Sequence, residues 1–328
     1  MTSKLDKLAS YTAASVVPLK VLLDQDLLES MALGKIIPVH PQLVITNRCN
    51  LNCHFCSCAD RDKGLELSLD EVTSVLDDLR RLGAKAITIT GGGEPLLHPH
   101  FNEIIHHCRN IGLKVGLVTN GLLLRKFTKK TLDILTWCRI SSEDDRLFSD
   151  AYSESLKKVV RGSPGVGWAF SHVTTNKPSF EVIGKIVDFS NRNNLTHVRL
   201  VSDLFQVEGT DLESVKAYLT EHKIDDKLVI YQGRKDFTVG SDCLIGFLKP
   251  TIYPDHKVYA CCGAQYALSE SSRDMPRELA LGTIETLNEL YSGPVRVFDG
   301  SVCSKCYYSS YNTLLSTLLK GIEHKEFV

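Results

Sequence analysis

Three cysteines lie close together near the beginning of the chain, at Cys49, Cys53 and Cys56. Thiolates are soft ligands that select iron-sulfur clusters, zinc or copper(I), and this spacing gathers three of them in one loop. Three thiolates can hold three irons of a 4Fe-4S cluster and leave the fourth iron open to a small molecule. Zinc, the alternative, normally takes four ligands in paired C-x2-C or C-x2-C/H-x3-H spacing. The C-x3-C-x2-C spacing therefore favours an iron-sulfur cluster with one open iron.

A glycine-rich segment, Gly91-Gly92-Gly93-Glu94-Pro95, follows an apolar strand expected at Ala86 to Thr90. Glycines at the carboxyl end of a strand let the backbone turn sharply and approach a ligand closely. The Glu94 carboxylate offers an acceptor for an ammonium group. A lone glycine cluster is most often an ordinary turn, but this one follows the cysteine loop by a single strand. We therefore interpret it as part of the same site.

Short apolar segments alternate with helical patterns from residue 41 onward, which is typical of parallel β/α units. Ser68 and Glu71 form a capping-box pattern at the start of the first such helix. The expected strands are Gln42 to Thr46, Ala86 to Thr90, Lys114 to Thr119, Arg139 to Ser142, Val166 to Val173 and His197 to Val201.

These motifs, in this order, resemble the radical S-adenosylmethionine (radical SAM) superfamily, whose members bind SAM through the open iron. The six strand-helix units resemble the open barrel of that family, so the expected fold class is α/β, a partial (β/α)6 TIM-like barrel. In such barrels ligands bind at the carboxyl ends of the strands. The cysteine loop, the GGGEP segment and Thr119-Asn120-Gly121 all fall at these ends.

The resemblance also implies SAM contacts, with the Glu94 carboxylate receiving the SAM amino group. The implied contacts are Phe55, Gly91, Gly92, Gly93, Glu94, Asn120, Ser141 and Ser142. Phe55 can equally be a core aromatic, and the two serines can be solvated strand-end residues. Substrate contacts are poorly marked. Arg199 and His172 are the candidates, whereas Asp203, Tyr231, Arg234 and Lys249 fit ordinary surface or ion-paired roles equally well.

A second group of cysteines lies in the last third of the chain, at Cys243, Cys261, Cys303 and Cys306. The segment before Cys261 has a hairpin pattern with Pro254-Asp255 at the turn. This arrangement resembles the twitch module, the shortened SPASM extension of some radical SAM enzymes, and implies a small C-terminal α+β module with an auxiliary 4Fe-4S cluster. His256 departs from the glycine that is usual there. A structural zinc site on the same cysteines, or Cys262 in place of Cys261, remains possible.

Composition narrows the class of protein. The 328 residues are 43% hydrophobic with a formal net charge of -1 and no long basic run, which argues against nucleic acid or an anionic membrane as partner. No membrane helix or signal peptide is evident, so we expect a cytoplasmic protein, and its eleven cysteines indicate metal or redox chemistry. The expected parts are an N-terminal helical segment (1–40, one helix over Ser15 to Gly34), the barrel (41–235) and the cluster module (236–328).

The resemblance implies an enzyme that cleaves SAM reductively to a 5'-deoxyadenosyl radical, which takes a hydrogen atom from the substrate, with a flavodoxin or ferredoxin type electron donor. A saturated second cluster suits electron transfer, which favours net oxidation (dehydrogenation) of a small molecule. A peptide or protein maturase is the alternative, although only about forty residues precede the barrel, few for a peptide-recognition domain. A non-catalytic iron-sulfur or zinc protein would explain the cysteines but not the GGGEP segment or the β/α units.

Overall fold

A computed structural model describes residues 17–203, 211–232, 242–264, 276–304, 306, 308–321 and 323. Within these residues a ten-stranded sheet has the order β11-β10-β9-β1-β2-β3-β4-β5-β6-β7. Its strands are β1 Gln42–Val44, β2 Ala86–Thr90, β3 Lys114–Thr119, β4 Leu135–Ser141, β5 Gly167–Thr174, β6 His197–Ser202, β7 Val229–Gln232, β9 Thr251–Ile252, β10 Lys257–Tyr259 and β11 Ala280–Thr283. A separate pair joins β8 Asp242–Cys243 to β12 Phe298–Asp299.

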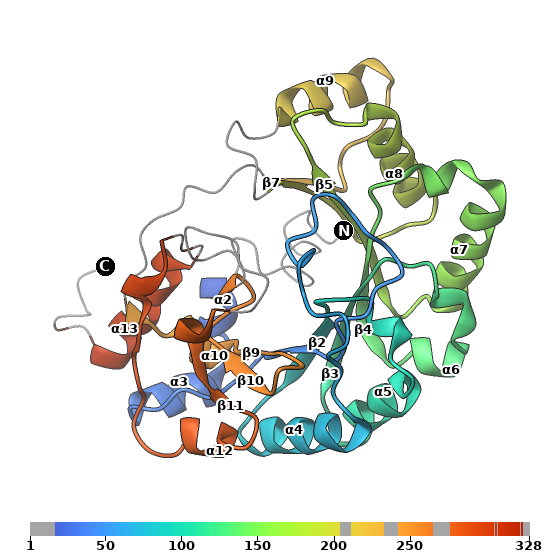
Figure 1. Cartoon of the computed structure of the whole chain (residues 1–328). Helices are drawn as coiled ribbons and strands as arrows, with labels where there is room; N and C mark the ends of the chain where they lie inside the picture. The colour runs from blue at the N-terminus through green and yellow to red at the C-terminus, as the bar shows by residue number, and fades with distance from the viewer. Residues whose placement is uncertain are drawn as a thin grey trace.

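Strands β1 to β7 are all parallel, each paired with the next. The six expected strands are confirmed with small shifts at their ends, and the partial barrel with them. The parallel strand β7 was not predicted, because Val229–Gln232 is short and follows a charged turn at Asp225-Asp226-Lys227. Figure 1 shows the curved sheet with helices along its outer side.

The outer helices are α4 Leu69–Arg81, α5 Phe101–Asn110, α6 Lys129–Leu132, α7 Asp150–Gly162, α8 Phe180–Arg192 and α9 Leu212–Glu221. The predicted capping box starts α4: the Glu71 amide donates to Ser68 Oγ at 3.3 Å, and the Ser68 amide donates to Glu71 Oε2 at 2.7 Å. The buried face of α4, which includes Val72 and Leu76, packs in the main core between helices and sheet. This core fixes the strands whose ends carry the site.

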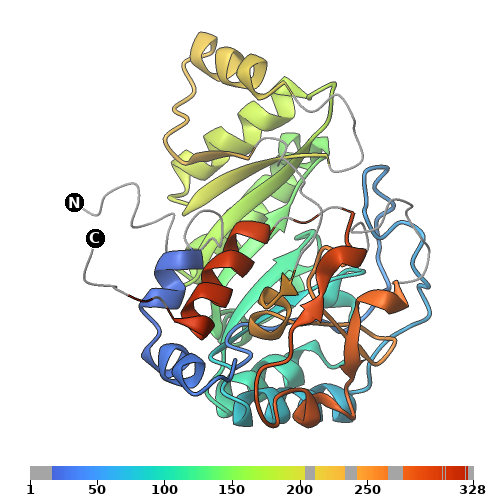
Figure 2. The same cartoon turned by 90° about the vertical axis from the view of Figure 1, so that its left-hand side faces the viewer.

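The N-terminal part packs with the last helices of the chain. The single helix expected over Ser15 to Gly34 is wrong within the described residues, which hold two helices, α2 Val17–Leu22 and α3 Gln25–Ala32. Asp24 separates them, because its side chain accepts a hydrogen bond from the Leu27 amide and caps α3. Both helices contact α13 Ser309–Lys320, and the second core includes α10 Ile245–Leu248. Figure 2 shows these blue and red helices side by side.

The C-terminal part continues the barrel sheet. Strand β9 pairs with β1 in parallel, and β10 turns back antiparallel to β9. The turn contains Pro254-Asp255, as predicted, and α12 Leu287–Leu290 follows β11. The boundary expected near residue 235 lies outside the described residues, but on either side of it the chain shares one sheet. No helix among the described residues is long and apolar enough to cross a bilayer.

His256 adopts the left-handed conformation that a glycine would take, with φ of 63°. An L residue in this conformation destabilises the fold by about 1–2 kcal/mol. The exposed His256–Glu71 ion pair at 3.1 Å stabilises it by less than that. We therefore expect His256→Gly to raise the free energy of unfolding by about 1 kcal/mol. His256→Val should lower it. Urea denaturation of both variants against wild type measures these changes, and a destabilised glycine variant would mean that the ion pair outweighs the backbone cost.

Candidate active site

The first three cysteines meet in the loop after β1. Burial, the nearby Glu143 carboxylate and then the thiols of Cys56 and Cys49 raise the pKa of Cys53 to about 11. The three thiols therefore lie within electrostatic reach of one another, and all three remain partly exposed. Three adjacent, accessible thiols fit the ligand set of a cluster with an open iron.

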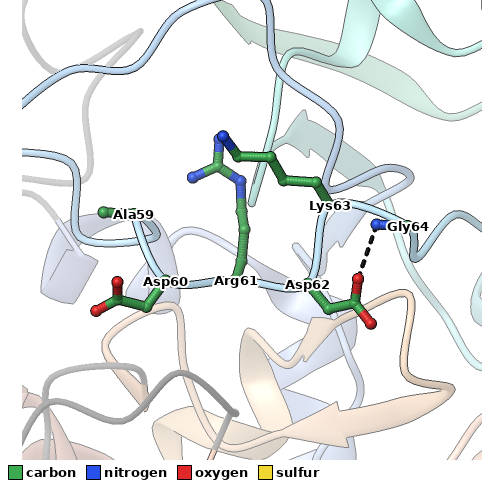
Figure 3. A pocket seen from close by; sticks show the side chains of 6 residues that line it. All are labelled: Ala59, Asp60, Arg61, Asp62, Lys63 and Gly64. Carbon is green, nitrogen blue, oxygen red and sulfur yellow. Dashed lines mark hydrogen bonds between the residues drawn. The ribbon is translucent and has the colours of Figure 1, made fainter.

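Arg61 lies against this cysteine loop and was missed in the sequence, where it reads as one of several charged loop residues. Its Nε donates to the Asn47 carbonyl at 2.9 Å, and Nη1 donates to Cys56 Sγ at 3.5 Å and to the Cys58 carbonyl. Hydrogen bonds from Cys58, together with the Arg61 charge, lower the pKa of Cys56 to about 6. Cys58 thus contacts Cys56, one of the three cysteines of this loop. Figure 3 shows the pocket that Arg61 lines with its neighbours from Ala59 to Gly64.

We expect Arg61→Gln to lower the reduction potential of a cluster held at Cys49, Cys53 and Cys56. The loss of a positive charge and of a hydrogen bond to a ligand sulfur disfavours the more negative, reduced cluster. A charge-assisted hydrogen bond of ~1.4 kcal/mol corresponds to about 60 mV for one electron. A redox titration followed by electron paramagnetic resonance measures the shift. Lys63→Gln, which removes an exposed cation from the same loop, is the control; equal shifts would leave Arg61 without a specific role.

Gly92 and Gly93 are required by close contact with the residues just before Cys49, and Gly91 by close contact with the Gly93 backbone. A Cβ atom at Gly93 would lie 2.0 Å from the Arg48 carbonyl oxygen, and one at Gly92 would lie 2.1 Å from Asn47 Oδ1. The Glu94 amide donates to the same Arg48 carbonyl at 2.7 Å. The sequence predicted that these glycines let the backbone approach a ligand closely. In the structure they let it approach the protein's own cysteine loop. The two motifs form one packed unit.

Glu94 is 2% exposed, and burial raises the pKa of its carboxyl group. Its Oε1 accepts from the Leu96 amide at 3.0 Å and from Thr119 Oγ1 at 2.7 Å, and its Oε2 accepts from the Asn120 amide at 2.7 Å. A carboxylate has about four acceptor positions, so Oε2 can accept one further bond. Glu94 joins the ends of β2 and β3 while keeping room for a donor.

Asn120 links the end of β3 to the cysteine loop. Its Nδ2 donates to Asn50 Oδ1, between Cys49 and Cys53, at 2.7 Å. At the end of β4, Ser141 Oγ lies 3.2 Å from Ser171 Oγ, whereas Ser142 is fully buried with no partner at its hydroxyl. Of the two serines, only Ser141 is partly exposed.

The remaining predicted residues do not all gather at this site. Phe55 is partly exposed and meets the His54 ring edge-on at 4.9 Å, outside the main core. His172 is 3% exposed, shares a strand face with the core residue Phe170, and lies 2.8 Å from the Ser142 carbonyl through Nδ1. Arg199 stands on the other face of the sheet, where it donates to Gln232 Oε1 at 3.0 Å. Arg234 lies outside the described residues.

The four late cysteines also gather. Burial, then the neighbouring thiols of Cys243 and Cys306, raise the pKa of Cys303 to about 11. Burial, and thiols that include Cys243 and Cys303, raise the pKa of Cys261. The Cys262 sulfur lies 3.7 Å from the Tyr308 hydroxyl, and the Cys262 thiol also acts to raise the pKa of Cys261. Four thiols within electrostatic reach of one another fit the number of donors that a second cluster needs. Across the described residues, no three potential ligands converge closely enough for a single metal ion.

The described residues form a partial α/β barrel with a loop of three cysteines at the carboxyl ends of its strands. The sequence model of the Radical SAM superfamily matches residues 43–137. The matched segment holds the cysteine loop and the GGGEP segment, so this part of the chain is similar to the radical SAM superfamily.

Curated relatives match parts of the chain of different lengths. A Methanococcus maripaludis protein named "Probable GTP 3',8-cyclase" is 38% identical over 95 residues, covering 28% of this chain and 32% of the relative. A "Tungsten-containing aldehyde ferredoxin oxidoreductase cofactor-modifying protein" from Pyrococcus furiosus is 28% identical over 212 residues, covering 60% and 56%. The chain thus spans about a third to somewhat over a half of the curated relatives it matches.

Solved structures share the fold over more of the chain. Streptococcus suis SuiB bound to S-adenosylmethionine has a TM-score of 0.58 at 18% identity, covering 89% of this chain and 75% of SuiB. The anSMEcpe protein with bound AdoMet and a Cp18Cys peptide has a TM-score of 0.52 at 13% identity, covering 89% and 86%. The structural similarity covers much more of the chain than residues 43–137, and it is a similarity of fold.

Proposed function

We propose that the chain is an enzyme that binds SAM beside a 4Fe-4S cluster and uses it to take a hydrogen atom from a substrate in the barrel. The observation that carries this proposal is the packed unit formed by the cysteine loop, the three glycines and Glu94 at the strand ends. When bound, the cluster and SAM supply reductive cleavage to a 5'-deoxyadenosyl radical, with the electron from a flavodoxin or ferredoxin type donor.

The protein's own residues bind and orient in this proposal. Cys49, Cys53 and Cys56 hold the cluster, and the free acceptor position of Glu94 takes the SAM amino group. The backbone of the glycine segment, with Asn120, Ser141 and Phe55, lines the remaining SAM site. Ser142 would contribute only after a local rearrangement, because its hydroxyl is buried. The surrounding barrel keeps water from the reacting atoms.

We further propose that the four late cysteines hold an auxiliary cluster and that the reaction is a net oxidation of a small molecule. Four protein ligands leave no iron for substrate, which suits electron transfer. A nucleotide cyclase or a cofactor- or peptide-modifying enzyme is the alternative, suggested by the names of the relatives. The chain covers only 32% of the first of these relatives, so its name bears little on the substrate. The expected compartment is the cytoplasm.

We expect Glu94→Gln to weaken SAM binding about tenfold, equivalent to ~1.4 kcal/mol. The amide oxygen can keep the two bonds that Oε1 accepts, but the NH2 group puts a donor in place of Oε2 and the negative charge is lost. Equilibrium dialysis of labelled SAM against the anaerobic, iron-loaded protein measures the change, with iron content as the check on the cluster. Unaltered SAM affinity at unaltered iron content would remove Glu94 from the SAM site.

The reaction class is tested by incubating the reduced protein anaerobically with SAM and candidate substrates. Polyols, amino alcohols, nucleotides and short peptides cover the proposed and alternative classes. A true substrate should raise 5'-deoxyadenosine above the substrate-free level and yield a product two mass units lighter. A product of unchanged mass would contradict net oxidation and favour cyclisation or epimerisation.

A further inference from the structure

Three cationic side chains converge inside the barrel, away from the cysteine loop. They are Arg139 on β4, Arg199 on β6 and Lys249, two residues before β9. Register places Arg139, Ala169 and His197 side by side in one row across β4, β5 and β6, and Ser141, Ser171 and Arg199 in the next row towards the carboxyl ends. Residues in one row of a parallel sheet face the same side.

Alternation along the strands identifies that side as the barrel interior. Cys138, Ile140, Val198 and Leu200, the neighbours of the two arginines, all belong to the core beneath the outer helices. Arg139 and Arg199 therefore point to the opposite, inner face, and both remain partly exposed. The β5 residues between them in these rows, Ala169 and Ser171, are small.

Trp137 forms a floor below the two rows. Its ring lies over Gly116, where a Cβ atom would come within 2.2 Å of it, and the Arg139 guanidinium lies 5.4 Å from the ring centroid. The contact with Trp137 holds the guanidinium by its face and leaves its edge, with the N–H donors, for a ligand. Arg199 is held in turn by Gln232.

The charges act on one another across the interior. Burial, then the Arg199 charge, lowers the pKa of Arg139 to about 9. Burial, then the Arg139 and Arg199 charges, lower the pKa of Lys249, while the Cys262 and Cys261 thiols act in the opposite direction. The Cys262 thiol acts on the pKa of Arg139 in the same way. Neither Arg139 nor Lys249 has a carboxylate in ion-pair distance among the described residues. Cationic side chains this close to one another favour the binding of an anion between them.

His197 provides an independent observation in the same row as Arg139. It is 2% exposed, and its Nε2 has no hydrogen-bond partner in the structure, while Nδ1 lies 3.0 Å from Thr196 Oγ1. A buried imidazole nitrogen without a partner is uncommon. The unpaired nitrogen adds a donor or acceptor to the ligand site that the cations outline.

We propose that Arg139, Arg199 and Lys249 bind an oxyanion of the substrate, a carboxylate or a phosphate, between the Trp137 floor and the SAM site. The proposal rests on the proposed function and narrows its substrates to anionic molecules. Arginine forks match the paired oxygens of carboxylate and phosphate, and Lys249 adds a point charge. With the anion held deep in the barrel, the rest of the substrate extends towards the strand ends, where the SAM contacts lie.

Isothermal titration of the anaerobic, iron-loaded protein with pyrophosphate and, separately, with malonate tests the site. We expect at least one probe to bind at one site per chain, and Arg139→Gln and Lys249→Gln each to weaken it at least tenfold. Arg161→Gln, which removes an exposed arginine of α7, is the matched control and should bind as wild type does. Binding of pyrophosphate alone identifies a phosphate site, and binding of malonate alone identifies a carboxylate site.

Two outcomes would overturn the proposal: neither probe binds, or the Arg161 variant loses as much affinity as the Arg139 variant. Arg139→Lys guards against a folding artefact, because it keeps the charge and should bind better than Arg139→Gln. Calorimetry needs no turnover, whereas the proposed function is tested by SAM cleavage in the wild-type preparation. Cleavage without anion binding would therefore refute this site alone, and anion binding without cleavage would refute the proposed function alone.

Discussion

The Cys49→Ala, Cys53→Ala, Cys56→Ala variant is expected to lose about four irons per chain and all reductive cleavage of SAM. Four is the iron content of one such cluster, and no alanine can ligate iron. The physical reason for a complete effect is that the three thiols are the only protein ligands proposed for this cluster. Iron analysis after anaerobic reconstitution, with 5'-deoxyadenosine by mass spectrometry, measures both losses.

Cys58→Ala is the matched control for the triple variant. Its sulfur lies beside Cys56 and near Ser57, at 3.9 Å from the Ser57 hydroxyl, but it is not among the proposed ligands. This variant should retain its iron. If Cys58→Ala loses as much iron as the triple variant, the ligand set has been assigned wrongly.

The second large effect is expected at the late cysteines. Reconstituted wild type should hold about eight irons, and a Cys303→Ala, Cys306→Ala variant about four, because each cluster contains four. The first site should still form 5'-deoxyadenosine in this variant, but oxidised product should not accumulate. Removing two of four thiols takes away half of the ligand set that gathers around Cys261 and Cys243.

Cys262→Ala serves as the comparison, because Cys262 is not among the four proposed ligands and its sulfur lies 3.7 Å from the Tyr308 hydroxyl. It should keep about eight irons, the content of two clusters. Zinc in place of iron at the late cysteines of wild type would make the module structural. Full product formation by the Cys303→Ala, Cys306→Ala variant would show that the oxidation does not need the late cysteines.

Local sequence signals predicted the barrel strands well. Hydrophobic runs of four to eight residues mark buried parallel strands, and the cysteines and glycines sit at their carboxyl ends. Strand β7 was not predicted from the sequence because it is short and only half-buried. The break between α2 and α3 was not predicted either. Asp24 caps α3, but in the sequence it lies within a continuous apolar pattern at helical spacing.

Contacts between distant segments could not be predicted in the same way. Arg61 reaches Cys56 through a loop whose course the sequence does not specify. Glycine at position 93 is needed because the Arg48 carbonyl lies against it, which is a property of the fold. Arg139 and Lys249 come together only because β9 pairs with β1 and continues the barrel sheet. His172 lies on the face of β5 that it shares with the core residue Phe170, whereas Arg199 lies on the opposite face of the sheet.

Formation of 5'-deoxyadenosine by the wild-type chain tests the central claim most directly. The anaerobically reconstituted protein, reduced with dithionite and supplied with SAM, should form 5'-deoxyadenosine and methionine in equal amounts. The same preparation without reductant is the control and should form neither. Iron-loaded protein that binds SAM yet forms no 5'-deoxyadenosine on reduction would contradict the account.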